Sequence, residues 1–109
     1  MTAQYQLTIA GGGRQVVSTP GVAVPLTTTG SVLCSMVQIN CLSTDTGAVV
    51  VCNSTAYAST GALRVGVPIW AGTTSPGVSV YTTDLQNVYI DATVSTDGVS
   101  FTYYRTTTP

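Results

Sequence analysis

The 109-residue sequence contains no lysine, no glutamate and no histidine. Charged side chains make up 6% of the chain, as three arginines and four aspartates, against about 25% in an ordinary soluble domain. General acid–base and nucleophilic catalysis both need converging titratable groups, usually with histidine or lysine as the base. The composition therefore predicts a protein that is not an enzyme, with no catalytic residues and no cofactor.

Basic clusters and long apolar runs are also missing. The three arginines, Arg14, Arg64 and Arg105, are scattered and the net charge is −1, whereas a protein that grips phosphates needs several cations on one face. We therefore expect no nucleic-acid partner. The longest apolar run, 48–52, has the length of a strand rather than of a membrane span, so no membrane partner is expected. Met1 is followed by polar residues without a secretory signal, which favours synthesis in a cytoplasm.

The three cysteines and the aspartates offer weak metal or redox sites. Cys34, Cys41 and Cys52 form no paired framework, and without histidine a three-cysteine zinc site lacks its usual fourth ligand. Small buried apolar side chains are the favoured interpretation, and a Cys41–Cys52 bridge across a short turn is the alternative. Asp84 with Asp91 is a weak candidate for a carboxylate pair or a calcium site, which would need several more oxygen ligands. We predict no metal.

Threonine, valine, serine, glycine and tyrosine fill the sequence instead. β-Branched and aromatic side chains fit a pleated sheet, and apolar residues recur with a period of two. We predict strands at 4–9, 14–17, 22–26, 32–41, 48–53, 68–70, 78–82, 87–94 and 99–104. Short strands with turn signals about every ten residues indicate an all-β fold: a single β-sandwich or jelly-roll-like domain of about seven or eight antiparallel strands, spanning 1–109. Segments 1–3 and 105–109 are expected to be extended tails.

Several details of this pattern can be compared with a structure. The triple glycine at 11–13 predicts the end of the first strand, and Asp97-Gly98 predicts a hairpin turn. Strand 32–41 is expected to direct Leu33 toward the core together with Val37, Ile39 and Cys41. Strand 48–53 is apolar on both faces, which predicts a central, covered position. Asp91 is expected on the outward face of its strand, and Asp45 and Asp97 in turns.

Residues 32–104 form one pattern. It begins with the alternating strand from Leu33 to Ile39, the run Val49-Val50-Val51 and Ala62-Leu63, and continues with Pro68-Ile69-Trp70-Ala71-Gly72, Asp84-Leu85-Gln86-Asn87-Val88-Tyr89-Ile90-Asp91 and Asp97-Gly98-Val99-Ser100-Phe101-Thr102-Tyr103. The pattern resembles the small β-sandwich virion proteins of tailed bacteriophages, in particular those that decorate or cement the capsid shell. The resemblance implies a structural protein on the outer capsid surface, bound to the major capsid protein and to copies of itself, as a trimer or a lattice-bound copy. A head–tail or fibre-base component is an alternative role.

Large polar-tipped and aromatic side chains are the candidate interface residues. The set comprises Arg14, Arg64, Trp70, Tyr81, Tyr89, Tyr104 and Arg105. Trp70 together with the tyrosines, Tyr57 included, could alternatively form an aromatic platform for sugars, as in a carbohydrate-binding or adhesion module. Scattered aromatic residues are more often core or interface anchors, so protein contact is the favoured interpretation.

Overall fold

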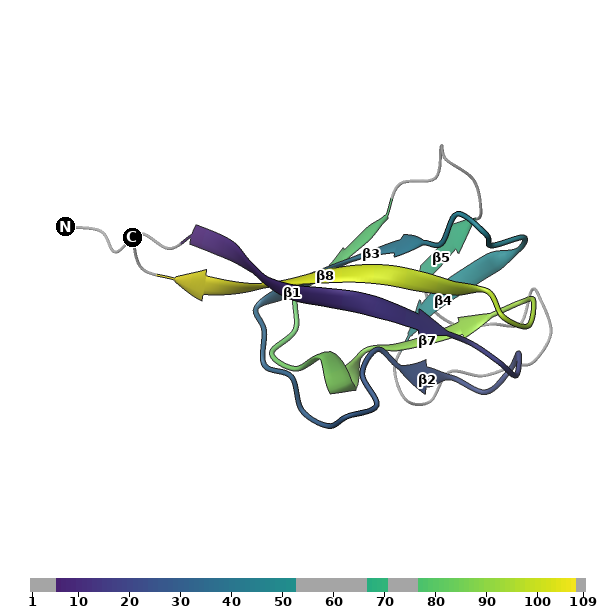
Figure 1. Cartoon of the computed structure of the whole chain (residues 1–109), viewed down its shortest axis with the longest axis horizontal. Coiled ribbons are helices and arrows are strands. Elements are labelled where there is room, and N and C mark those ends of the chain that lie inside the picture. Colours follow the sequence, from purple (N-terminus) through teal and green to yellow (C-terminus); the bar gives the residue numbers. More distant parts are fainter. Residues whose placement is uncertain (1–5, 53–66, 71–76, 108–109) are drawn as a thin grey trace.

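The computed structural model describes residues 6–52, 67–70 and 77–107, and the regular secondary structure in this part of the chain consists of strands and one short helix (Figure 1). The strands are β1 (Gln6–Val16), β2 (Val24–Pro25), β3 (Met36–Cys41), β4 (Ala48–Cys52), β5 (Val67–Trp70), β6 (Val78–Val80), β7 (Tyr89–Ala92) and β8 (Gly98–Thr107). One short 3-10 helix, η2 (Leu85–Asn87), precedes β7. The predicted all-β class is confirmed.

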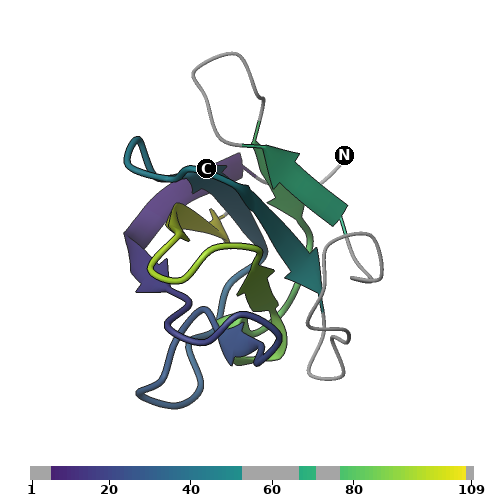
Figure 2. The same ribbon diagram turned by 90° about the vertical axis from the view of Figure 1, so that its right-hand side faces the viewer.

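The strands form two four-stranded antiparallel sheets. Sheet A has the order β1-β8-β3-β6 and sheet B the order β2-β7-β4-β5. The first strand pairs with the last, β2 with β7, β3 with β6 and β4 with β5, so that the pairs are nested inside one another. This nesting, folded over into two layers, is the eight-stranded jelly roll that was one of the two predicted architectures. Figure 2 shows the sandwich from one end.

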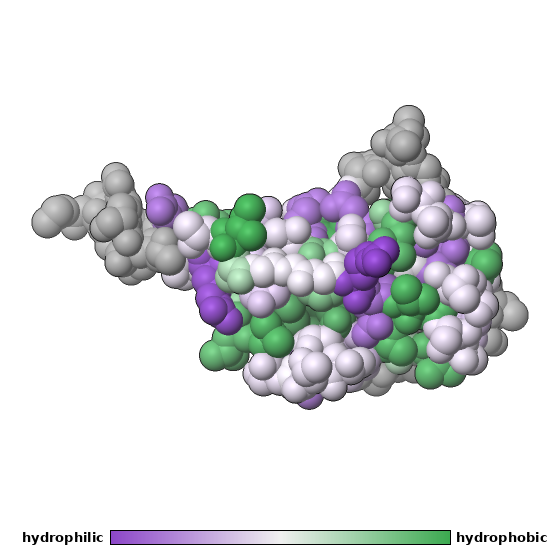
Figure 3. Space-filling view, in the orientation of Figure 1, coloured by the Kyte–Doolittle hydropathy of each residue, from purple (hydrophilic) through white to green (hydrophobic). Residues whose placement is uncertain are grey.

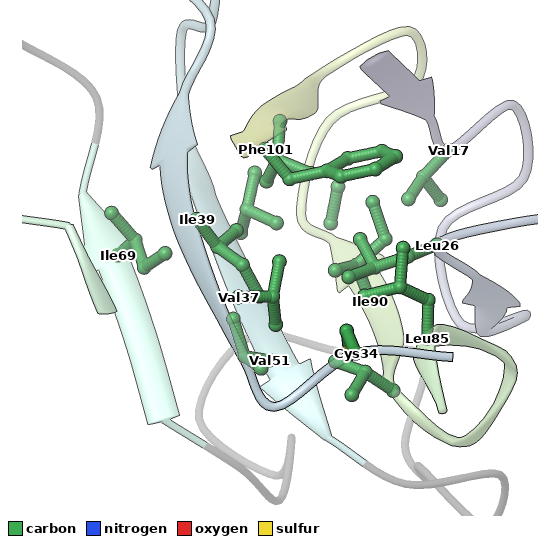
Figure 4. Close-up of a cluster of buried hydrophobic side chains, with 14 residues drawn as sticks. Val17, Leu26, Cys34, Val37, Ile39, Val51, Ile69, Leu85, Ile90 and Phe101 are labelled. Carbon is green, nitrogen blue, oxygen red and sulfur yellow. The ribbon is translucent and has the colours of Figure 1, made fainter. Parts of the chain in front are cut away.

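The core lies between the inward faces of the two sheets (Figure 4). Sheet A contributes Val37 and Ile39 of β3 with Val99 and Phe101 of β8, and all four are buried, as the alternation predicts. Sheet B and the connecting segments of both sheets complete the cluster with Val17, Leu26, Cys34, Val49, Val51, Ile69, Leu85, Val88, Ile90 and Ala92. Because both layers offer β-branched side chains, the core is filled without a helix.

β4 occupies the central, covered position predicted for it, between β7 and β5. Ala48, Val49, Val50 and Val51 are all buried, so both faces of this strand are covered. A strand buried on both faces loses the polar-outward alternation, which is why its sequence is continuously apolar.

The prediction that Leu33 points into the core is wrong, because its side chain is 63% exposed. Regular pairing begins only at Met36, and before it the chain forms an isolated bridge between Leu33 and Asp84. The Cys34 N–H donates to the carbonyl of Thr83, and this contact places Cys34 in the core instead. In the loop before β3 an even-numbered residue, Cys34, points inward, whereas in β3 the odd-numbered residues Val37 and Ile39 point inward.

The prediction that the triple glycine ends the first strand is also wrong. β1 continues through Gly11, Gly12 and Gly13 as one strand of 11 residues. Gly11 lies opposite Tyr103 and Gly13 opposite Phe101, and a Cβ would lie 2.5 Å from the Tyr103 hydroxyl oxygen at the first position and 3.2 Å from the Phe101 ring at the second. The glycines therefore make room for two aromatic rings that cover them.

A β-bulge divides β1 into two parts. Ile9 pairs with Tyr104 and Gly11 with Tyr103, so Ala10 is an extra residue without a partner of its own. Paired residues share a face of the sheet, and Tyr103 and Tyr104 point to opposite faces. Gly11 therefore faces the core, whereas Ile9 faces outward and is 71% exposed. The bulge directs the apolar residues of the first part of β1 to the outside of sheet A.

The prediction of a hairpin at Asp97-Gly98 is wrong, because β7 belongs to sheet B and β8 to sheet A. Segment 93–98 carries the chain from one layer to the other, and Thr96 adopts a left-handed conformation with φ of 73° within it. Asp97-Gly98 thus lies at a turn, but this turn connects two layers rather than two neighbouring strands.

β1 and β8 extend together beyond the rest of sheet A. Residues 6–9 pair with residues 104–107, and this pair of segments, which we name the terminal ribbon, projects from the sandwich in Figure 1 as the purple and yellow ends of the two strands. Arg105 and Thr106, expected in a tail, are therefore paired strand residues. The part of the predicted tails at 1–3 and 108–109 lies outside the described residues.

The position of the core predicts that truncating two apolar residues in adjacent segments lowers the stability by very different amounts. Ile39→Ala should lower the free energy of unfolding by about 3 kcal/mol, since Ile39 is completely buried and truncation leaves a cavity. Leu33→Ala should change it by less than about 0.5 kcal/mol, because Leu33 is exposed. Urea denaturation followed by circular dichroism measures both, and equal effects would contradict the assignment of faces.

Candidate functional site

The structure does not bring the predicted aromatic residues together. Trp70, 64% exposed, lies on the edge strand β5 beside Ala48, whereas Tyr89 lies on β7 beside Cys52, at the other end of the same sheet. Tyr81, 79% exposed, follows β6 in sheet A, and Tyr104 is half-buried in β8. Four aromatic side chains in separate places form no common platform. Tyr57 lies outside the described residues.

The predicted arginines are also separate. Arg14 is exposed on β1, opposite Ser100. Arg105 lies in the terminal ribbon, where its Nε donates to the carbonyl of Leu33 at 2.9 Å and its guanidinium carbon lies 5.9 Å from the centre of the Tyr103 ring. This arginine holds the 31–35 loop against the ribbon. Arg64 lies outside the described residues.

The strand register gathers a different set of residues on the face of sheet A that points away from the core. We name this surface the outer face. It carries Leu7, Ile9, Arg14, Val16, Met36, Gln38, Asn40, Ser79, Ser100, Thr102, Tyr104 and Thr106. Arg14 is the only charged residue among them. The centre of the outer face presents hydroxyl and amide groups, and its margin along β1 presents aliphatic side chains.

One row of the outer face is apolar across three strands. Ile9 of β1 pairs with Tyr104 of β8, which pairs with Met36 of β3. Leu7 lies two residues further along β1 and is partly exposed. In Figure 3 apolar surface is visible where the terminal ribbon leaves the sandwich. Alternation within 99–104 predicts that Tyr104 points outward. The pairing of Ile9 with Tyr104 depends on the bulge, which no pattern in the sequence indicates.

The β3–β4 and β7–β8 loops lie at the end of the sandwich that faces the viewer in Figure 2. Two buried aspartates, one in each loop, bind these loops together. Asp45 accepts from the N–H of Leu42 in its own turn and from the N–H of Gly98 in the other loop, at 3.1 and 2.8 Å. Asp97 in return accepts from the N–H of Thr46 and of Gly47, at 3.1 and 2.8 Å. Each aspartate is predicted to serve its own turn. Asp45 does so and also binds the other loop, whereas the Asp97 carboxylate binds the other loop.

Asp91 was expected to point into solvent and is 1% exposed. Its Oδ1 accepts from the N–H of Gly21 at 2.9 Å, so the segment around Gly21 packs over this side of sheet B. Asp84 serves a different segment: it caps η2 by accepting from Gln86 N–H, and also accepts from Ser31 and from Val32. Within the described ranges no three Cys or Asp side chains form a group that could hold a metal ion.

The three cysteines are free thiols. β3 and β4 belong to different sheets, so the symmetric spacing of Cys41 and Cys52 around a turn does not bring them together, and the alternative of a bridge is wrong. The Sγ of Cys41 donates to the carbonyl of Ile69, and that of Cys52 to the carbonyl of Tyr89. Burial raises the pKa of Cys41 to about 12 and that of Cys52 to about 11. Thiols that stay protonated at neutral pH are poor nucleophiles.

No model of a known protein family matches the sequence, and a search of curated proteins finds no match. Among the described residues no helix has the length and apolar character required to cross a membrane. The outer face of sheet A, with the terminal ribbon, is therefore the candidate functional site on physical grounds alone.

The mutual binding of the two loops predicts a stability effect at Asp97. Asp97→Ala should lower the free energy of unfolding by about 1 to 2 kcal/mol, because the N–H groups of Thr46 and Gly47 lose their acceptor in a partly buried place. Thr44→Ala, in the same loop but exposed, should stay within about 0.5 kcal/mol of the parent. Chemical denaturation at neutral pH measures both, and an Asp97 variant as stable as the Thr44 variant would refute the role.

A pH dependence follows from Asp84. The hydroxyl of Ser31 and the N–H of Gln86 bind its carboxylate and lower its pKa below the ordinary value of 3.8. A carboxyl with a depressed pKa in the folded state stabilises the protein above the pKa of the unfolded chain, and this stabilisation disappears as the pH falls through the folded pKa. The melting temperature of the parent should therefore exceed that of Asp84→Asn at neutral pH.

The difference between the two proteins should become smaller as the pH falls below the ordinary carboxyl pKa of 3.8 and the carboxyl takes up its proton. Thermal melts of both proteins at each pH give the difference directly, and the other aspartates cancel because both proteins contain them. A difference that is constant over the whole range would show that the Asp84 charge has no role.

Proposed function

We propose that the protein is a structural component of a tailed-bacteriophage virion, a decoration or cement protein that binds the major capsid protein on the outside of the head shell and lies across neighbouring capsomers. The observation that carries the proposal is the outer face of sheet A, which is exposed in the single chain and holds one charged residue, Arg14, beside the apolar row of Ile9, Tyr104 and Met36.

Electrostatics supports a protein partner for this face. Removing charged groups from water on binding is costly, and Arg14 is the only such group on the outer face. The remaining polar groups, among them those of Gln38 and Thr102, are amides and hydroxyls that can both donate and accept hydrogen bonds to a neighbouring backbone. A surface with few charges and with aliphatic side chains beside neutral polar groups is suited to a second protein surface, because charged residues are depleted at the centre of protein interfaces.

The chemistry of the described residues supports a non-catalytic role. Asp45, Asp91 and Asp97 are buried and bound to backbone N–H groups, and Asp84 is bound to three groups at the start of η2. A general base must be within reach of a substrate proton, and these carboxylates already serve the fold. The four carboxylates that could act as general bases thus have structural functions.

The jelly roll is consistent with this proposal as an analogy, since viral capsid proteins use it, but lectins and cupins use it too. A carbohydrate-binding role would need several aromatic rings in one place, and the separation of Trp70, Tyr81 and Tyr104 does not favour it. A head–tail or fibre-base component would use the same kind of neutral surface at another position in the virion. Location in the particle distinguishes these two structural roles.

The proposal predicts binding to a head shell through the outer face. Thr102→Arg places a large charged side chain at the centre of this face, and we expect it to weaken binding to shells that lack the protein at least tenfold, because the added charge loses its hydration in the contact. Thr44→Arg adds the same charge in an exposed loop at the end of the sandwich away from the terminal ribbon and should bind like the parent. Co-sedimentation with purified shells measures the affinity.

Cryo-electron microscopy of the virion tests the location. Density of the size of this domain on the outside of the shell, bridging capsomers, is the expected result. Density at the neck or tail would transfer the protein to the alternative structural role, and a virion without the chain would refute both roles.

A further inference from the structure

Three of the four edges of the two sheets are formed by short strands, and the fourth by a long one. β2 has two residues and includes Pro25, β5 has four and includes Pro68, and β6 has three. Short edge strands and prolines hinder the addition of a further strand, and proteins use them to prevent association. The fourth edge is β1, with 11 residues and without proline, and among the described strands β8 is its one neighbour.

The backbone of β1 offers hydrogen-bonding groups along this edge. The N–H of Val17 donates toward the β8 side, to the carbonyl of Asp97, whereas that of Val16 points away and donates to the side chain of Gln15. In an antiparallel pair alternate residues direct both backbone groups to the same neighbour. Register is continuous from Gly11 to Val16, so Gly12 and Arg14, like Val16, direct their N–H and C=O groups to the open edge.

The side chains of β1 favour an uncharged strand as the partner. Residues 6–13 contain no charged residue, and Leu7 and Ile9 expose aliphatic surface on the outer face. The terminal ribbon consists of two strands, and a two-stranded ribbon alone is marginally stable in water. A third strand beside β1 would supply the missing hydrogen bonds and cover part of Ile9.

We propose that β1 pairs antiparallel with β1 of a second copy of this chain, so that the two A sheets become one continuous sheet across a two-fold axis. Among the described strands one exposed edge strand is long enough to match this edge, and it is β1 itself, in which residues 6–13 carry no charge. Antiparallel pairing of identical strands is self-complementary, and a self-complementary contact closes with two copies. The expected assembly is therefore a dimer rather than the trimer or lattice-bound copy that the resemblance implies.

This inference goes beyond the proposed function, because self-pairing is measured in solution without any shell. Sedimentation velocity of the full chain over a range of concentrations should show two species, the 11.2 kDa monomer and a dimer, and no larger assembly. A protein that stays monomeric at every concentration, or one that forms a trimer, would overturn the proposal.

Two variants of Arg14 separate the effect of the backbone N–H at the strand edge from the effect of the side-chain charge. Arg14→Pro removes the outward N–H, whereas Arg14→Thr removes the same charge and retains the N–H. We expect the dissociation constant of the dimer to rise at least tenfold with proline and to change less than threefold with threonine. Equal dissociation constants for the two variants would overturn the proposal, and melting curves show whether the proline variant is folded.

Amide hydrogen exchange of the unmodified chain gives a result that does not depend on folding of a variant. The N–H groups of Gly12 and Arg14 should exchange fast in dilute solution and at least tenfold more slowly at concentrations that favour the dimer. The amides of β6 at the opposite edge serve as the internal control and should show no dependence on concentration. Dimerisation without slower exchange at Gly12 and Arg14 would place the contact elsewhere and overturn the proposal.

Discussion

The pairing of the first strand with the last is the contact on which the rest of the structure depends. β1 and β8 are neighbours in sheet A although almost the whole chain lies between them, and the other three pairs are nested within this one. Such pairing closes a long loop at considerable entropic cost, which is recovered only when long stretches of backbone and side chain come together. The glycines opposite Phe101 and Tyr103 permit this close approach, since a Cβ at Gly11 would collide with the Tyr103 hydroxyl.

The few carboxylates of this protein all have structural roles, and the fold needs few other charged residues. Asp45 and Asp97 bind two loops at one end, Asp91 binds the segment around Gly21, and Asp84 caps η2. Each satisfies backbone N–H groups that no strand partner can reach. Few charges remain for the surface, which leaves the outer face of sheet A nearly neutral and suited to contact with another uncharged surface.

The sequence was sufficient for those parts of the fold that depend on local pattern. Alternation identified the core side chains of β3, β7 and β8, such as Val37, Ile90 and Phe101, and the continuous apolar run identified β4 as covered. It failed where distant segments decide. The glycines continue a strand because aromatic rings on β8 cover them, and Asp91 is buried because the segment around Gly21 lies over it. The candidate surface belongs to the second group, because its composition follows from the register between β1 and β8.

The single extra residue at Ala10 gives the terminal ribbon an orientation of its own. Every position before it is displaced by one step in the two-residue repeat, so the first part of the strand and the second part obey opposite rules for inside and outside. Evolution can therefore alter the chemistry displayed by residues 6–9 without disturbing the glycine–aromatic contacts that hold the sandwich closed. Related chains that lack this insertion would present the reverse side of the same segment, and so would offer polar rather than aliphatic groups to whatever they meet.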